Sequence, residues 1–304
     1  MLPRRGHRPA AARTVTAAAL SALALAGALL PATSATAEAL PLSPTDQTAH
    51  DRLAIRSNIA ELGPDLAGVV VDAETGQEIW SRTPTERQIP ASTVKIITAV
   101  NALEVFGPGH RFVTRAMTGA TPRQVVLVGA GDPSLSWSDL RRLAAGTART
   151  VKAAGLTRVR VRVDDSLFPR PTNAYGWRST YTIADVSPVR ALVVAQHRGW
   201  DTSLHAGRAF AEMLRKKGLS VRRTVVRATR PEGSTEIAAV RGDDVTTQVV
   251  GMLRTSDNDV AEGLHRLVAL QSGYPATWEG AAEAQVAVLA GLGVRVAPGR
   301  LHDG

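Results

Sequence analysis

The sequence predicts an α+β protein whose main domain is interrupted by an inserted second domain. Three features of the 304 residues predict it. An antiparallel hairpin is followed by a packed helix, the next long stretch alternates short strands with turns, and the last part is helical again. With 44% hydrophobic and 21% charged residues, the chain has the balance of a globular protein of one or two domains and is long enough to bury a core.

The first residues have the composition of a secretory signal. Arginines precede an uncharged run rich in Ala and Leu, 14–30, which is too short and too rich in Ala to favour a membrane span. Small residues then predict cleavage after Ala37 or Ala39. We therefore expect 1–37 to be a signal peptide and the protein to be secreted into the cell envelope; the alternative is an uncleaved N-terminal anchor.

The charge and the cysteine content exclude several functions. Without the leader arginines Arg4, Arg5, Arg8 and Arg13, the formal charge of +9 falls to about +5, spread over both halves without a dense basic block. Nucleic acid is therefore not an expected partner, whereas an anionic cell envelope suits a mildly basic exported protein. The chain has no cysteine, which excludes disulfides, zinc–thiolate sites and a cysteine nucleophile.

The first folded segment contains the hairpin and the packed helix. A helix-like segment, 53–62, precedes strands at 66–71 and 77–81, and the turn 72–76 between them makes the pair an antiparallel hairpin. Pro90 restricts the backbone ahead of Ser92, and apolar residues at helical spacing predict a packed helix over 93–106. Gly107-Pro108-Gly109 ends it.

The pattern of predicted secondary structure changes after residue 109. Strand candidates at 124–128, 158–163, 192–195, 221–227 and 236–240 alternate with Gly/Pro turns and brief helices. We interpret 110–243 as an inserted domain and 38–109 with 244–304 as the domain that it interrupts. Helices are then expected from 246, with a break at 255–258, over 259–270 and over 278–289.

Ser92 and Lys95 are the first candidates for chemistry. They lie three residues apart at the start of the predicted helix, so their side chains are on the same face and can meet. Apolar neighbours such as Val94 and Ile96 would desolvate the ammonium and lower the pKa of Lys95, as a proton acceptor for serine requires. The alternative is that Ser92 caps the helix and Lys95 is a solvated surface residue.

Ser256-Asp257-Asn258 is the second candidate and stands between two predicted helices. Here too a structural role is open, because Ser256 could cap a helix with Asp259 as the reciprocal acid three residues on. A Ser–Lys pair that opens a helix and a later Ser-Asp-Asn are together two of the three elements of the penicillin-recognising serine enzymes, and they occur in the right order.

Further blocks strengthen this resemblance. Pro90-Ala91-Ser92-Thr93-Val94-Lys95 resembles the family's Pro-Ala-Ser-x-x-Lys, and 256–262 with Arg266 resembles its Ser-Asp-Asn-x-x-Ala-Glu stretch. The segments 131–135, 164–168 and 181–192 are similar to blocks of one branch, the D-alanyl-D-alanine carboxypeptidase/endopeptidase group of the penicillin-binding protein 4 type, peptidase family S13. The resemblance covers nearly the whole mature chain.

The resemblance implies a fold and an activity. The fold is that of serine β-lactamases and penicillin-binding proteins, an antiparallel sheet flanked by helices, here with the insert. The activity is that of a serine-type carboxypeptidase that cleaves D-Ala-D-Ala in peptidoglycan stem peptides, with or without endopeptidase activity on cross-links, and that is acylated by β-lactams. The implied catalytic residues are Ser92 as nucleophile, Lys95 as proton acceptor, Ser256 as proton relay and Asn258 as substrate ligand. No metal or organic cofactor is required.

The sequence departs from the family pattern in one respect. The third motif, Lys or His followed by Thr or Ser and Gly, is missing, and no lysine follows Lys217. Asp303-Gly304 resembles the start of the Asp-Gly-Ser-Gly-Leu segment that precedes this motif in the family. We therefore expect a sequence truncated at its C-terminal end, which could be inactive as it stands.

Other functions remain open at this point. A serine β-lactamase shares the motifs, although the long interval between Ser92 and Ser256 and the branch-specific blocks argue against it. A non-catalytic wall-binding module of the same fold would fit the missing motif. An unrelated envelope protein with helix caps at both motifs is a third alternative. Glu262 and His265 share a helix face, but without a second such pair a metal site is not expected.

Overall fold

A computed structural model describes residues 41–58, 62–63, 65–296 and 301–304. The chain divides between Gln88 and Ile89 into two compact units. The predicted signal peptide and its cleavage positions lie outside the described residues. Among the helices that are described, none is both long and apolar enough to cross a membrane.

The first unit contains helix α1 (Pro44–Arg56) and an antiparallel hairpin of β1 (Gly68–Val71) and β2 (Glu78–Arg82). The helix begins nine residues before the predicted segment, because the Ser43 side chain accepts the backbone N–H of Asp46 and Pro44 suits the first helical position. In the turn, the Asp72 carboxylate accepts the N–H groups of the next residues, a local bond that stabilises the reversal. The predicted hairpin is confirmed.

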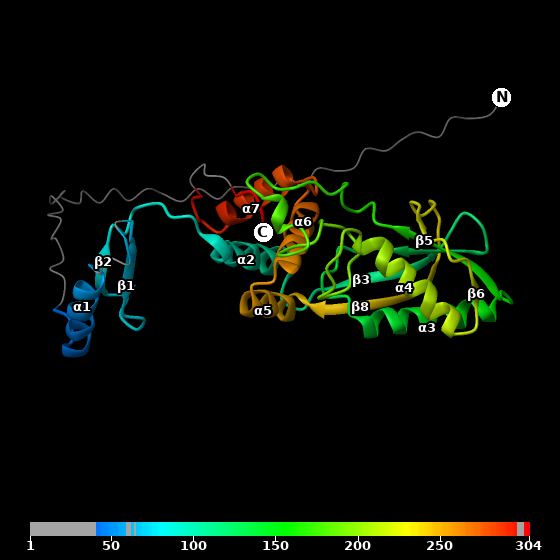
Figure 1. The fold of residues 1–304 in the computed structure, drawn as a ribbon, viewed down its shortest axis with the longest axis horizontal. Coiled ribbons are helices and arrows are strands. Elements are labelled where there is room, and N and C mark those ends of the chain that lie inside the picture. The colour runs from blue at the N-terminus through cyan, green and yellow to red at the C-terminus, as the bar shows by residue number, and fades with distance from the viewer. Residues whose placement is uncertain (1–40, 59–61, 64, 297–300) are drawn as a thin grey trace, which may run out of the picture. The chain divides into compact units, whose positions relative to one another are not determined.

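The second unit contains the remaining elements (Figure 1). In chain order they are the 3-10 helix η2 (Ala91–Val94), α2 (Lys95–Phe106), β3 (Arg111–Thr118), β4 (Gln124–Val128), α3 (Trp137–Ala153), β5 (Arg158–Asp164), the 3-10 helix η3 (Ser179–Tyr181), α4 (Thr202–Lys216), β6 (Ser220–Val221), β7 (Val226–Arg227), β8 (Glu236–Asp244), α5 (Val245–Thr255), α6 (Asn258–Gln271) and α7 (Trp278–Gly291). Helices α5 and α6 each begin where an aspartate caps the first turn.

A mixed six-stranded sheet organises the inserted region. The strand order is β6-β5-β4-β3-β8, with β7 also paired to β5. The pairs of β3 with β4 and with β8 are antiparallel, whereas β5 pairs in parallel with β4, β6 and β7. Alternate residues of β5 point to opposite faces of this sheet, so its valines and its arginines lie on different sides.

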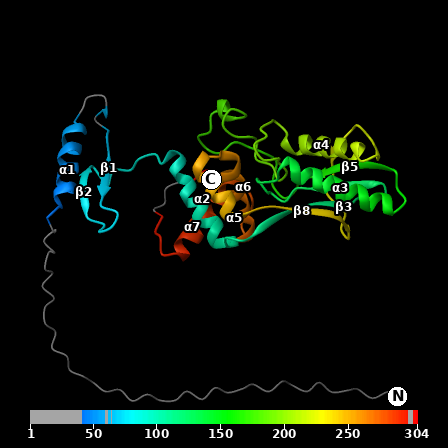
Figure 2. The ribbon, with the colours of Figure 1, turned by 90° about the horizontal axis from the view of Figure 1, so that it is seen from below.

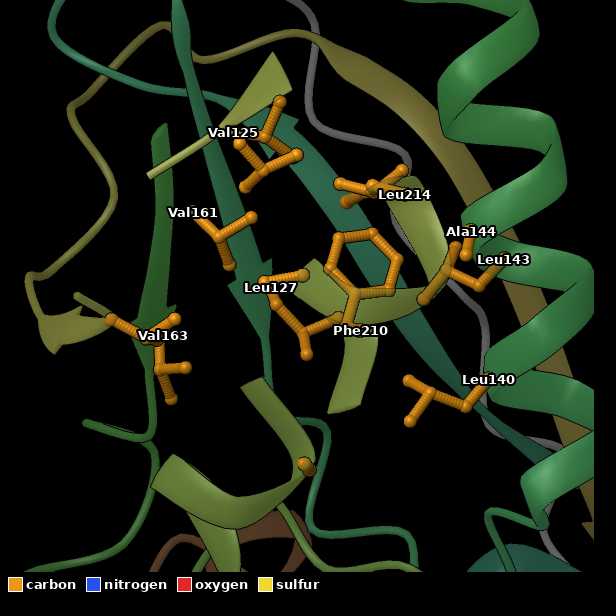
Figure 3. Packing of buried hydrophobic residues seen from close by; sticks show 14 of the residues in the cluster. Val125, Leu127, Leu140, Leu143, Ala144, Val161, Val163, Phe210 and Leu214 are labelled. Atoms are coloured by element: carbon orange, nitrogen blue, oxygen red, sulfur yellow. The ribbon is translucent and has the colours of Figure 1, made fainter. Parts of the chain in front are cut away.

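Helices α3 and α4 cover the face of the sheet that carries the valines. The ring of Phe210 from α4 is fully buried and lies beside Leu127 of β4, with Leu140 and Leu143 of α3 nearby (Figure 3). Gly207 permits the close approach of α4, because a Cβ there would lie 2.3 Å from a methyl carbon of Val163. This cluster is the larger of the two hydrophobic cores.

The second core joins the helix that follows Ser92 to the C-terminal helices. Helix α2 packs against α5, α6 and α7, and both ribbon views show the four together (Figures 1 and 2). Its buried residues include Ala102 of α2, Met252 of α5, Leu264 of α6 and Ala281 of α7. Segments from the two ends of this unit are therefore packed together around α6.

Two strand predictions in the insert are wrong. Residues 192–195 form no strand; this buried segment instead joins residues 131–135, as the bond from the Ala195 N–H to the Leu135 carbonyl shows (2.8 Å). The strand predicted over 221–227 is two short strands, β6 and β7, which pair with successive parts of β5. The predicted domain boundaries at 109/110 and 243/244 stay predictions.

Candidate active site

Two serines occupy unusual backbone positions in the second unit. Ser92 lies on η2, one turn before α2, and the preceding Ala91 has a φ of 47°. Ser256 itself has a φ of 56° and ends α5 in the left-handed region. Residues with a Cβ adopt this region at an energetic cost, which persists where the surrounding structure imposes it, and such positions cluster at functional sites.

The side chains of the four predicted site residues meet. Ser256 Oγ donates to Ser92 Oγ over 2.8 Å, and Lys95 Nζ donates to the same Ser92 oxygen over 3.2 Å. Lys95 Nζ also donates to Asn258 Oδ1 at 2.6 Å. The hydroxyl of Ser92 therefore contacts an amine on one side and a second hydroxyl on the other.

Burial changes the chemistry of Lys95. The residue is only 4% exposed, and loss of solvation lowers the pKa of its ammonium group. The carboxyl groups of Glu262, Asp303 and Asp257 act in the opposite direction. The net effect is a lowered pKa, so a larger fraction of Lys95 is the free amine at neutral pH and can accept a proton from a serine hydroxyl.

The amide of Asn258 is held in one orientation. Its Nδ2 donates to the backbone carbonyl of Asp185 over 3.0 Å, so Oδ1 faces Lys95. A flipped amide would place an N–H group opposite the Lys95 ammonium and a carbonyl opposite another carbonyl, which loses both bonds. The Asp185 carbonyl therefore ensures that the Asn258 amide turns its oxygen, and not its nitrogen, toward Lys95.

A clamp of side chains holds the segment 184–187 that supplies this carbonyl. Asp259, next to Asn258 on α6, accepts the Ser187 N–H at Oδ1 (2.7 Å) and Arg198 Nε at Oδ2 (3.0 Å). Arg198 Nη1 also donates to the Ala184 carbonyl. We call Arg198 and Asp259 the loop clamp, because together they bond both sides of Asp185.

Glu262 lies on α6 one turn after Asn258 and is 3% exposed. Its Oε1 accepts the Gly304 N–H over 3.0 Å, while Oε2 has no hydrogen-bond partner among the described residues. Burial raises the pKa of Glu262 to about 8. The carboxyl group therefore holds a proton to a higher pH than an exposed glutamate does, and once ionised its charge opposes the lowering of the Lys95 pKa.

Helix capping does not explain the two motifs. The N-terminal position of η2 has no side-chain cap, and the Ser92 hydroxyl bonds Ser256 and Lys95 instead. Helix α6 is capped by the side chain of Asp257, which accepts the Val260 N–H, and not by Ser256. The alternative interpretation, in which Ser256 caps a helix with Asp259 as the reciprocal acid, does not hold, because Ser256 ends the preceding helix and Asp257 caps α6.

Sequence reasoning missed the roles of Asp185 and Arg198. A backbone carbonyl has no side-chain signature, and Arg198 resembles the many other arginines of the chain.

Glu262 and His265, which share a helix face, are both buried, and burial lowers the pKa of His265 to about 3. Within the described ranges, no three or more His, Cys, Asp or Glu residues are grouped so that they could hold a metal ion.

The chain is similar in sequence to known proteins. The sequence profile of the D-Ala-D-Ala carboxypeptidase 3 (S13) family matches residues 49–199 and 195–304. The chain is 33% identical over 250 residues to carboxypeptidase Rv3627c of Mycobacterium tuberculosis, covering 76% of this chain and 54% of the relative. It is 29% identical over 338 residues to carboxypeptidase DacB of Mycolicibacterium smegmatis, covering 99% and 73%.

A solved structure shows the same fold. Penicillin binding protein 4 (dacB) of Haemophilus influenzae superposes with a TM-score of 0.67 at 19% identity, covering 81% of this chain and 73% of that one. The predicted fold class, a penicillin-binding-protein-like α+β fold, is confirmed, with a mixed rather than purely antiparallel sheet in the insert. The chain spans about half the length of the mycobacterial relative Rv3627c.

Proposed function

Because this chain belongs to the D-Ala-D-Ala carboxypeptidase 3 (S13) family, we propose that the protein is a serine-type D-alanyl-D-alanine carboxypeptidase acting on peptidoglycan stem peptides. One observation carries the proposal: Ser92 Oγ contacts both Lys95 Nζ and Ser256 Oγ. A buried amine with a lowered pKa next to a hydroxyl is the arrangement that activates a serine nucleophile. The curated relatives are named carboxypeptidases, which supports the same activity.

Acylation follows from these contacts. Ser92 Oγ attacks the carbonyl carbon of the penultimate D-alanine while the free amine of Lys95 takes the hydroxyl proton. The bond to the terminal D-alanine nitrogen then breaks as Ser256 gives its hydroxyl proton to this leaving amine, and the proton that Lys95 took from Ser92 replaces it on Ser256. The backbone N–H of Ser92 is one donor to the oxyanion, and such a donor is commonly worth about 3 kcal/mol. The products are an ester on Ser92 and free D-alanine.

Deacylation reverses the roles of the same groups. A water molecule attacks the ester carbonyl while Lys95 accepts the water proton; Lys95 then gives this proton to Ser92 Oγ, which leaves as a hydroxyl. Asn258 serves both steps, since its Oδ1 fixes Lys95 next to Ser92. We also propose that Asn258 forms a hydrogen bond with the substrate amide when the substrate lies over Ser92.

The proposal also covers where the protein acts and which compounds inhibit it: we expect it in the cell envelope and acylated by β-lactams. The leader arginines and the apolar run after them support export to the cell envelope, where the stem peptides are found. A β-lactam presents a strained amide to Ser92 and would leave a stable ester. One solved relative of the same fold is described as a complex with a β-lactam, which supports this expectation.

Labelling with a fluorescent penicillin tests the proposal on the full-length protein. Wild type should carry a stable covalent label and release D-alanine from a diacyl-Lys-D-Ala-D-Ala peptide. Ser92→Ala should do neither. Ser234→Ala is the matched control, because the Ser234 hydroxyl bonds only the nearby Pro231 carbonyl in a turn and should label as wild type does.

The outcomes separate the alternatives. A label that is lost within seconds, with hydrolysed penicillin in solution, would identify a serine β-lactamase. Absence of label on a folded full-length protein would identify a non-catalytic wall-binding module. Persistent labelling of Ser92→Ala would show that another residue is the nucleophile.

A further inference from the structure

One face of the six-stranded sheet carries an unusual concentration of arginine. Along β5, Val159, Val161 and Val163 face the core under α3 and α4, so the alternate residues Arg158 and Arg160 point to the opposite side. Both arginines are exposed. In the ribbon view, β5 lies apart from α2 and α5, the helices next to Ser92 and Ser256 (Figure 1).

A cavity of about 400 Å³ opens among these side chains. Its lining consists of Arg123, Arg158, Val159, Arg160, Ser220, Val221 and Arg222. We call it the arginine pocket. It contains four guanidinium groups and no carboxylate, and within the described part of the chain none of the four makes an ion pair. Three arginines on other strand positions do have acidic partners: Arg111 pairs with Asp244, Arg115 with Glu236 and Arg227 with Asp165.

The strand pairing brings these like charges together. Arg158 is paired with Ser220 across β5 and β6, and the Arg222 N–H still donates to the Val159 carbonyl beyond β6 (3.4 Å). The Arg160 N–H donates to the Arg123 carbonyl on the other side (2.8 Å). Like charges on neighbouring strands repel each other, and no acidic side chain in the lining offsets this repulsion. A bound anion would.

The lining also indicates the kind of anion. Each guanidinium presents several N–H donors in a plane that matches phosphate oxygens, and one phosphate can be shared by two arginines. The pocket has no aromatic side chain on which a nucleic acid base could stack. Its only apolar residues are the buried Val159 and Val221, so no apolar group is available to insert into a membrane.

We propose that the arginine pocket binds the phosphodiester groups of a linear, base-free polyanion of the poly(glycerol phosphate) type. The pocket spans a turn and two strands, which suits a chain that offers successive phosphates. Binding there would hold the protein on an anionic polymer through a surface separate from Ser92. The site is independent of the proposed carboxypeptidase activity.

Binding of soluble poly(glycerol phosphate) to the full-length protein tests this site. The triple variant Arg158→Gln/Arg160→Gln/Arg222→Gln should lose at least about tenfold in affinity at about 50 mM salt, and the slope of log affinity against log salt should fall by roughly one for each lost arginine–phosphate contact. The matched control is Arg141→Gln/Arg149→Gln/Arg208→Gln, which removes the same charge from exposed positions on α3 and α4. This control should bind within about twofold of wild type.

Other outcomes would overturn the proposal. An equal loss in both triple variants would show binding by net charge alone. Wild type that does not bind the polymer, or that binds duplex DNA or anionic vesicles more tightly through the same three arginines, would exclude the proposed ligand. Penicillin labelling of both variants provides a check on folding, because Ser92 lies outside the pocket.

Discussion

Removal of the Arg198 side chain tests whether the loop clamp positions Asn258. Arg198→Ala removes two hydrogen bonds: the one that fixes the Asp259 carboxylate at Oδ2 (3.0 Å) and the one to the Ala184 carbonyl of the segment 184–187. The Asp185 carbonyl, which orients the Asn258 amide, then has fewer constraints. We expect Asn258 to hold Lys95 next to Ser92 for a smaller fraction of the time.

The structure sets the magnitude of this effect. The Arg198 and Asp259 side chains are 39% and 20% exposed, so their ion pair is partly screened. Exposed pairs contribute up to about 1 kcal/mol, and hydrogen bonds to charged groups contribute about 1.5–3 kcal/mol when buried. An intermediate loss of about 1–2 kcal/mol in transition-state stabilisation corresponds to a 5- to 30-fold slower acylation, at roughly 1.4 kcal/mol per factor of ten.

Stopped-flow acylation by a chromogenic β-lactam separates the acylation rate constant from the dissociation constant of the initial complex. The rate constant should fall while the dissociation constant changes little, because Arg198 does not touch Ser92. Arg215→Ala is the matched control: Arg215 pairs with Glu212 and donates to the carbonyls of Val221 and Arg222. Its variant should lose similar stability yet acylate normally. Equal slowing in both variants, or normal acylation in Arg198→Ala, would refute the positioning role.

Three further predictions follow from burial and packing. The acylation rate should rise with pH through an apparent pKa below the usual value of lysine, because burial lowers the pKa of Lys95; a midpoint at the value of a free lysine would contradict this. The raised pKa of Glu262, about 8 against about 4.5 when unfolded, means that the folded state binds an extra proton between these values. The free energy of unfolding should therefore fall as pH rises through this range, by at most about 1.4 kcal/mol per pH unit, and Glu262→Gln should flatten the slope in denaturant titrations. Gly207→Ala should lower the free energy of unfolding by about 1–3 kcal/mol, because its Cβ would overlap Val163, whereas Gly251→Ala on α5, which has open space, should raise it by about 0.4–1 kcal/mol; equal effects in calorimetry would contradict the packing argument.

Much of the local structure was predictable from local patterns. The strand at Gln124–Val128 has the predicted bounds, and the break between α5 and α6 lies at the Ser256 motif. Apolar periodicity and turn residues report such elements directly. Helices α3 and α4 were not located, although Ser136 and Asp139 form a capping box that marks the start of α3. The two predicted strands that the structure corrects do contain the expected apolar residues. No described strand, however, pairs with either segment along its whole length.

The chemical groups of the site and the contact between Ser92 and Lys95 could be read from the sequence, because residues one helical turn apart meet wherever the helix forms. The bond from Ser256 to the same hydroxyl, across 164 residues, depends on the tertiary structure. The tertiary structure also decided the orientation of Asn258 and the clamp at Arg198, which depend on the path of the segment 184–187. Helical spacing is a property of neighbouring residues, whereas these contacts exist only because α2 and α6 pack together in one core.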